Sequence, residues 1–282
     1  MTGKKLACVI ADSGGTKTSW AFVYLDNSRV FFDTKSYHPV NFCEAFFGDS
    51  KQFLESYITT KVPLYFFGAG MGKLGNRQVL HGLFRTHFSS VAIFTDIQGV
   101  VHALDMKSGV IAVMGTGSVL VEVHRGSIRR QVGGRGHLLG DEGSAYYFGK
   151  LVLAAYSAQQ LTEKQVEDLA STVDIQTVSR KEQLTKKYET ANLAKVLDSE
   201  LFEPFHRRNI QLFLATHIDG QMDTDELVIV GSYAYFNRVA IAEELRIRRI
   251  ENVQFINNPI ELICERLVGP RVTGAGPVGF GW

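Results

Sequence analysis

Several features that mark common protein classes are missing from this sequence. No apolar stretch approaches the roughly 18–20 residues that span a bilayer, and Asp12 interrupts the one apolar run near the N-terminus, so neither a membrane span nor a signal peptide is expected. The three cysteines, Cys8, Cys43 and Cys264, lie far apart without a CxxC spacing, which argues against a structural metal site. We therefore expect a cytoplasmic, reduced protein.

An excess of charge of one sign is also missing. The chain has 30 Lys and Arg, 29 Asp and Glu and a net charge of +1, and its basic residues are scattered. This distribution gives no footprint for nucleic acid or for an anionic membrane. Because 45% of the 282 residues are hydrophobic, a soluble globular protein with a sizeable core is expected.

Apolar runs separated by glycine turns open the sequence. Residues 6–11 form an apolar run that ends in a glycine turn, and residues 20–25 and 30–32 form two more. This order predicts strand, tight turn, strand, strand. A glycine loop that leads into a strand is neither a Rossmann fingerprint nor a Walker loop, since both of those lead directly into a helix.

The same opening returns in the middle of the chain. After alternating helical and strand patterns up to Leu104, residues 109–113 form an apolar strand, followed by the turn Gly115-Thr116-Gly117-Ser118 and a strand over 119–123. We interpret this as two lobes, residues 1–107 and residues 108–282, each opening with strand, turn and strand.

Two glycine loops are candidate phosphate sites. The first is Asp12-Ser13-Gly14-Gly15-Thr16-Lys17-Thr18, and the second is Gly115-Thr116-Gly117-Ser118. Glycines let the backbone approach a phosphate, and successive N–H groups form an anion site. Asp12, at the end of a strand, can hold Mg²⁺ through water. An ordinary hairpin turn is the alternative for each loop, but two such loops together favour a clasp around the phosphates of ATP.

Acidic residues follow later in the pattern. Asp96 ends a short strand, where it can either cap a helix or accept the proton of a hydroxyl during phosphoryl transfer. A glycine-rich loop over 133–145 contains Asp141 and Glu142. These carboxylates can hydrogen-bond vicinal sugar hydroxyls, and they can equally cap the helix that follows.

With these elements in this order, the chain resembles the N-acetylglucosamine kinase group within the wider BadF/BadG/BcrA/BcrD ATPase family. The resemblance covers residues 7–150 and rests on DSGGTKT, TDIQGVVHAL, VMGTGS and GGRGHLLGDEGSAYYFG. It implies an α/β fold of two actin-like (ribonuclease H-like) lobes, each a mixed sheet flanked by helices, with ATP and Mg²⁺ in the cleft between them.

The resemblance also implies roles for individual residues. Asp96 would be the general base on the 6-hydroxyl of an amino sugar such as N-acetylglucosamine, and Asp12 would anchor Mg²⁺. The residues expected to face the nucleotide are Gly14, Gly15, Thr16, Lys17, Thr116, Gly231 and Ser232. The residues expected to line the sugar pocket are Asn41, Gly70, Ser118, Gly134, Arg135 and Asp141. A homodimer is a further expectation.

Two other functions stay open at this point. The same family contains activators of 2-hydroxyacyl-CoA dehydratases and benzoyl-CoA reductases, which are ATPases that hold an iron–sulfur cluster between subunits through cysteine thiolates. A sugar or ATP sensor without chemistry is the other alternative. The sequence leaves open which amino sugar is the acceptor, since the candidates differ by one acyl group or one stereocentre.

Overall fold

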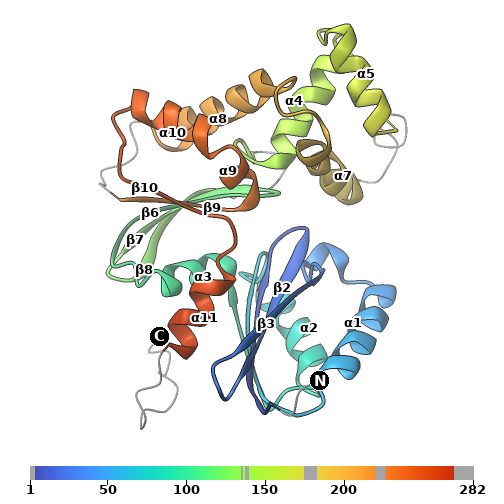
Figure 1. Cartoon of the computed structure of the whole chain (residues 1–282), viewed down its shortest axis with the longest axis vertical. Helices are drawn as coiled ribbons and strands as arrows, with labels where there is room; N and C mark the ends of the chain where they lie inside the picture. Colours follow the sequence, from blue (N-terminus) through green and yellow to red (C-terminus); the bar gives the residue numbers. More distant parts are fainter. Residues whose placement is uncertain (1–3, 135, 137–139, 175–182, 220–225, 270–282) are drawn as a thin grey trace. The chain divides into compact units, whose positions relative to one another are not determined.

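The computed structural model of the chain describes residues 4–134, 136, 140–174, 183–219 and 226–269. Contacts between backbone positions divide the chain into two units. Unit 1 comprises residues 1–106 together with residues 259–282, and unit 2 comprises residues 107–258. Each unit contains one five-stranded sheet with its own helices (Figure 1).

Unit 1 has the element order that the sequence predicts for the first lobe. Its strands are β1 (Leu6–Ser13), β2 (Lys17–Tyr24), β3 (Arg29–Lys35), β4 (Pro63–Gly68) and β5 (Ser90–Thr95). Its helices are the 3₁₀ turn η1 (Pro39–Asn41), α1 (Glu44–Tyr57), α2 (Leu74–Phe84), α3 (Asp96–Ala103) and α11 (Ile260–Val268). The strand order is β3-β2-β1-β4-β5, antiparallel from β3 to β1 and parallel from β1 to β5.

Both faces of the central strands β1, β2 and β4 are buried, because successive apolar side chains point to opposite faces of the sheet. On β4, Phe66 packs with Trp20 and Phe84 in a core that α1 and α2 cover. The next residue, Phe67, belongs to the core on the opposite face, which includes Ile263 of α11. Figure 1 shows α1 and α2 on one side of the sheet and α3 and α11 on the other.

Unit 2 repeats this sheet topology. Its strands are β6 (Ser108–Met114), β7 (Ser118–His124), β8 (Ser127–Gly133), β9 (Leu227–Val230) and β10 (Val253–Ile256). The order β8-β7-β6-β9-β10 is antiparallel from β8 to β6 and parallel from β6 to β10. The helices are α4 (Ala145–Ser157), α5 (Glu163–Thr172), α7 (Gln183–Val196), α8 (Glu203–His217), α9 (Ser232–Phe236) and α10 (Arg238–Ile247). The matching strand orders agree with the interpretation of two lobes that open alike.

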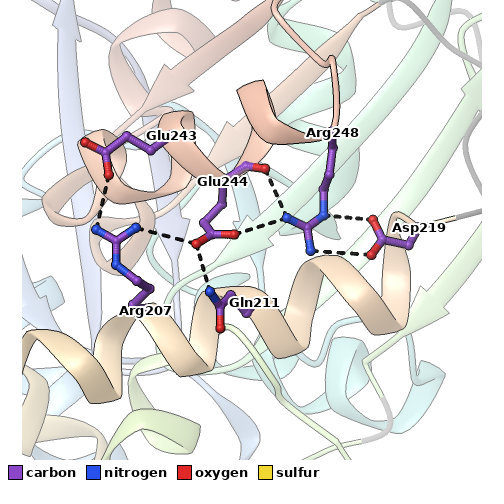
Figure 2. Close-up of polar contacts among 6 residues, drawn as sticks. All are labelled: Arg207, Gln211, Asp219, Glu243, Glu244 and Arg248. Atoms are coloured by element: carbon purple, nitrogen blue, oxygen red, sulfur yellow. Dashed lines mark hydrogen bonds and ion pairs between the residues drawn. The ribbon is translucent and has the colours of Figure 1, made fainter.

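Two helix clusters complete unit 2. Helices α8, α9 and α10 bury apolar side chains such as Phe213, Ala234 and Ile241 against β6, β7 and β9, while α4, α5 and α7 form a second core around Phe148 and Leu193. A polar network also joins α8 to the region of α10 (Figure 2). The nearly buried carboxylate of Glu244 accepts hydrogen bonds there from Arg207, Gln211 and Arg248. These donors hold the pKa of Glu244 below its usual value against the opposing effect of burial.

One helix departs from the expected division of the chain. The sequence assigns everything after residue 107 to the second lobe, but α11 packs against α3, β1 and β2 of unit 1. Ile260, Ile263 and Cys264, at helical spacing, place their side chains in the core with Cys8 and Ile10. Among the described residues, no helix is both long enough and apolar enough to cross a bilayer.

Candidate functional site

The first glycine loop connects β1 to β2 as expected. The Gly14 N–H donates to the Lys17 carbonyl at 3.0 Å, which closes the turn. The backbone of Gly14 is not in the left-handed region, and a Cβ added there would come no closer than 3.9 Å to another atom. Neither the backbone conformation nor the packing of this turn therefore requires glycine, so the open space around Gly14 is available to a ligand.

Three segments of unit 1 converge beside this loop. In the parallel part of the sheet, Ser13 of β1 lies level with Gly68 of β4, and Gly68 lies level with Thr95 of β5. The carboxyl ends of these strands therefore share one edge, which brings Asp12, the Gly68–Gly70 turn and Asp96 to the same place. This edge is where open α/β sheets bind ligands.

Two carboxyl groups at this edge have perturbed acidity. Burial raises the pKa of Asp12 to about 7, the negative charge of Asp96 adds to the increase, and Lys17 opposes it. Burial likewise raises the pKa of Asp96, while backbone hydrogen bonds from Ile97 and from Asp96 itself lower it. Each of these two residues is partly buried as a whole.

The chemistry of the two carboxyl groups fits Mg²⁺. No group of three or more metal-binding side chains gathers within the described ranges, but Mg²⁺ is commonly held by one or two carboxylates, with water and substrate phosphates as its other ligands. Two buried carboxyl groups that repel each other are also relieved by a divalent cation. Asp12 is the residue of unit 1 that suits this role, and the charge of Asp96 acts on it.

Asn41 and Gly70, both predicted to bind sugar, are brought together in unit 1. Gly70 has a φ of +78°, and a Cβ there would lie 2.8 Å from Pro39 and 3.4 Å from His38, so the turn after β4 fits closely against the segment that carries Asn41. The side-chain amide of Asn41 donates to the Ser36 carbonyl at 2.6 Å. Ser36, which the sequence analysis missed, donates its hydroxyl to the Gly14 carbonyl at 2.6 Å and so connects this segment to the glycine loop.

Thr16 and Lys17 are exposed in the first loop, and the preceding Gly15 is partly buried. Lys17 forms an ion pair with Asp33 of β3, with 2.7 Å between Nζ and Oδ2. More than half of the Lys17 side chain is exposed, and such exposed pairs are weak. The ammonium can therefore exchange Asp33 for a phosphate at little cost.

The second glycine loop occupies the equivalent position in unit 2, between β6 and β7. Gly115 also lies outside the left-handed region, and no atom lies within 4 Å of a Cβ added there. Helix α4 supports the loop, because the N–H groups of Ala145 and Tyr146 donate to the carbonyls of Gly115 and Thr116 at 2.9 and 3.3 Å. The first turn of α4 thus binds the carbonyl groups of the loop.

Gly231 joins the second loop from β9. Its φ is +121°, and a Cβ there would lie 2.6 Å from the Met114 carbonyl oxygen and 3.2 Å from the Gly115 nitrogen. Only glycine permits this approach. Ser232, which begins α9, is exposed beside it. The structure therefore brings together two of the three segments that the sequence analysis assigned to the nucleotide.

Asp141 and Ser118 contact each other in unit 2, since the Ser118 N–H donates to Asp141 Oδ1 at 3.2 Å. The Ser118 hydroxyl donates to the Glu142 carbonyl at 2.6 Å, so in this structure it holds the acidic loop. Asp141 has a φ of +73° and forms an ion pair with Lys187 of α7, 2.9 Å from Oδ2 to Nζ. Lys187 is not among the residues that the sequence predicts for the site.

A buried network lies under the acidic loop. Asn209 accepts the Gly143 N–H at 2.7 Å and donates to the Ser144 carbonyl and the Tyr233 hydroxyl, each at 2.9 Å. One amide on α8 thereby holds both the acidic loop and α9. Gly134, predicted to bind sugar, follows β8, and a Cβ there would lie 2.7 Å from Gln131 and 3.0 Å from Val119. Arg135 lies outside the described residues.

Comparison with known proteins was made by sequence and by structure. No protein-family model matches the chain, and no curated protein matches it in sequence. A candidate N-acetylglucosamine kinase of Porphyromonas gingivalis is similar in structure, with 22% identity and a TM-score of 0.73 over 92% of this chain and 98% of that one.

Two other solved structures extend the likeness. A candidate N-acetylglucosamine kinase of Chromobacterium violaceum gives 17% identity and a TM-score of 0.66 over 93% of this chain and 99% of that one. The ethanolamine utilization protein EutJ of Carboxydothermus hydrogenoformans gives 11% identity and a TM-score of 0.53 over 93% and 88%. The chain therefore has the two-lobe actin-like α/β fold, as the sequence resemblance implied.

Proposed function

We propose that this protein is an ATP-dependent kinase that transfers the γ-phosphoryl group to the 6-hydroxyl of N-acetylglucosamine or a close relative. The observation that carries the proposal is the pair of equivalent loops, in which Gly14 and Gly115 have open space around them and no structural need for glycine. Each loop would bind phosphate groups of ATP through its backbone N–H groups. The names of the two candidate kinases with the same fold agree with this function.

Asp96 is the general base of the proposed reaction. The sugar 6-hydroxyl gives its proton to the Asp96 carboxylate while its oxygen forms a bond to the γ-phosphorus, and the bond from that phosphorus to the β,γ-bridging oxygen breaks to release ADP. A carboxyl whose pKa burial has raised is a stronger base than an ordinary aspartate. When bound, Mg²⁺ would neutralise charge on the β- and γ-phosphates, and Asp12 would help to hold it.

The sugar-binding residues that we propose are Asn41 and Gly70 in unit 1 and Asp141 in unit 2. The turn that carries Asn41 and the turn that carries Gly70 pack against each other, so a sugar can meet both. Whether the acceptor is N-acetylated depends on groups that contact its acyl chain, and Arg135 is our candidate for one of them.

The positions of the cysteine thiols argue against the alternative function, an ATPase activator that holds an iron–sulfur cluster. Cys8 and Cys264 lie in the apolar core of unit 1, and burial raises the pKa of Cys264 to about 12. A thiol in that environment is a poor source of the thiolate that a cluster requires. Cys43 is exposed, so each chain would offer one accessible thiol.

ADP release by the purified protein tests the proposed function. With Mg-ATP and a panel of amino sugars, we expect turnover that depends on the sugar and is highest with an N-acetylated hexosamine. Hydrolysis independent of sugar would instead indicate an activator-type ATPase. Binding of ATP without any turnover would indicate a sensor.

The Asp96→Asn variant extends this test to the base. We expect its turnover to fall by about two to four orders of magnitude, the range that general-base catalysis contributes, while ATP binding stays at the wild-type level. Normal turnover in this variant would rule out Asp96 as the base. Calorimetric titration with ATP provides the control, because it reports binding without chemistry.

A further inference from the structure

Lys187 lies against the second glycine loop, 46 residues from its ion-pair partner Asp141. The Asp141 side chain is 3% exposed and that of Lys187 is 19% exposed, so the pair is largely shielded from solvent. A Cβ placed on Gly117 would lie 3.2 Å and 3.3 Å from the two Asp141 carboxylate oxygens and 3.3 Å from Lys187 Nζ. Both charges therefore directly contact the turn of the loop.

Helix α4 holds this arrangement in place. Its first N–H groups bind the carbonyls of Gly115 and Thr116, and further along it crosses α7 at Gly149. A Cβ on Gly149 would lie 2.1 Å from the Thr190 carbonyl oxygen, so the crossing is as close as backbones allow. Because Thr190 lies less than one turn from Lys187, the same helix fixes both the loop and the ammonium.

The Lys187 ammonium neutralises negative charge beside the loop. A carboxylate in contact with a phosphate loop repels the phosphate, and Lys187 cancels that charge. An ammonium has three N–H donors, and within the described residues Asp141 Oδ2 accepts one of them. A polyphosphate on the loop, with more negative charge than one carboxylate, would attract the same ammonium more strongly.

We propose that Lys187 is a phosphate-binding residue of the second loop, whose ammonium donates to a phosphate oxygen of the nucleotide held by residues 115–118. The ion pair with Asp141 holds this ammonium at the loop and keeps the buried Asp141 charge paired. The inference rests on the proposed nucleotide role of the loop, and it adds a cation from α7 to a site that the sequence analysis built from backbone groups and hydroxyls.

The test measures the Kd for ATP and for adenosine by titration in the presence of Mg²⁺. For Lys187→Met we expect the affinity for ATP to fall roughly 10- to 100-fold, the effect of losing one charge-assisted hydrogen bond, while the affinity for adenosine stays unchanged. Lys187→Arg should retain most of the affinity for ATP. Lys195→Met is the matched control, because Lys195 lies exposed on the same helix and should leave both affinities unchanged.

A double-mutant comparison separates direct binding from an effect through Asp141. If Lys187 contacts the phosphate, Lys187→Met should still weaken ATP binding in the Asp141→Asn variant, although by less than in the wild-type chain, where the unpaired Asp141 carboxylate would also repel the phosphate. Loss of the effect in the Asp141→Asn background would overturn the proposal and reduce Lys187 to the partner of Asp141. An unchanged affinity for ATP in Lys187→Met would refute this inference alone, whereas failure of the wild-type protein to bind ATP would refute the proposed function and this inference together.

Discussion

At the scale of the residue, the glycines of the candidate site fall into two kinds. Gly231 and Gly70 are glycines because their backbones adopt positive φ and because neighbouring atoms leave no room for a side chain. Gly14 and Gly115 have neither constraint. A glycine that the fold does not need, at the same turn in both units, is accounted for by a ligand that must approach the backbone.

Substitutions at these glycines separate ligand binding from folding. Gly14→Val and Gly115→Val should each weaken ATP binding by roughly 10-fold or more, because a side chain would occupy the place of a phosphate oxygen, at a cost to stability of about 0.5 kcal/mol. Calorimetric titration and thermal unfolding measure the two quantities. Gly231→Val is the opposite control and should unfold at a lower temperature. Unchanged ATP affinity in both loop variants would contradict the role of the loops.

Asp12 gives the free protein a pH dependence with a definite sign. Its pKa is about 7 in the folded chain and 3.8 in its ordinary state, so its contribution to stability is full below pH 4 and is lost as the pH rises through 7. Asp12→Asn should therefore raise the unfolding temperature relative to wild type more at pH 8 than at pH 5, when both are measured without Mg²⁺. The same difference at both pH values would show that the Asp12 pKa is not raised.

At the scale of the element, the sequence predicted what local patterns determine. The two strand–turn–strand openings were predicted because an apolar run, a glycine turn and a second apolar run are all contiguous. The ion pair of Asp141 with Lys187 was missed because it joins residues 46 positions apart through the packing of α7 on α4. Residues 232–247 form two helices, α9 and α10, which meet at Asn237.

The close packing of α4 on α7 positions Lys187. A substitution at Gly149, where the two helices cross, tests this packing. Alanine normally stabilises a helix interior by about 1 kcal/mol relative to glycine, but here its Cβ would lie 2.1 Å from the Thr190 carbonyl oxygen. Gly149→Ala should therefore destabilise the protein by about 1–3 kcal/mol in chemical denaturation. Gly82→Ala in α2 is the matched control, since no atom lies within 4 Å of its new Cβ, and it should stabilise the protein. An equal gain from both substitutions would contradict the close crossing.

At the scale of the whole molecule, the chain forms two mixed sheets with the same strand order, and its last described helix, α11, packs on the sheet of unit 1. The repeated topology was predictable from the repeated opening. The packing of α11 was not, because nothing local in residues 260–268 says which sheet they will cover. The spacing of Ile260, Ile263, Cys264 and Leu267 does signal an amphipathic helix, and this signal could have been used to find α11.

A substitution at Ile263 tests whether α11 stabilises unit 1, because the Ile263 side chain is fully buried in the core of that unit. Ile263→Ala should destabilise the chain by about 2–4 kcal/mol, and amide exchange should increase in β1 and β2 while β6 and β7 keep their protection. Ile247→Ala is the control, since Ile247 is 74% exposed. Loss of protection in β6 and β7 with β1 and β2 unaffected would mean that α11 supports unit 2.

The most direct test of the central claim is the identity of the product. Wild-type protein, Mg-ATP and N-acetylglucosamine would be incubated together, and the product would be identified by phosphorus–proton correlation in NMR. The account predicts a phosphate monoester whose phosphorus couples to the two protons on carbon 6 of the sugar, formed together with ADP. Inorganic phosphate as the sole phosphorus product besides ADP, or a phosphate on another carbon of the sugar, would contradict it.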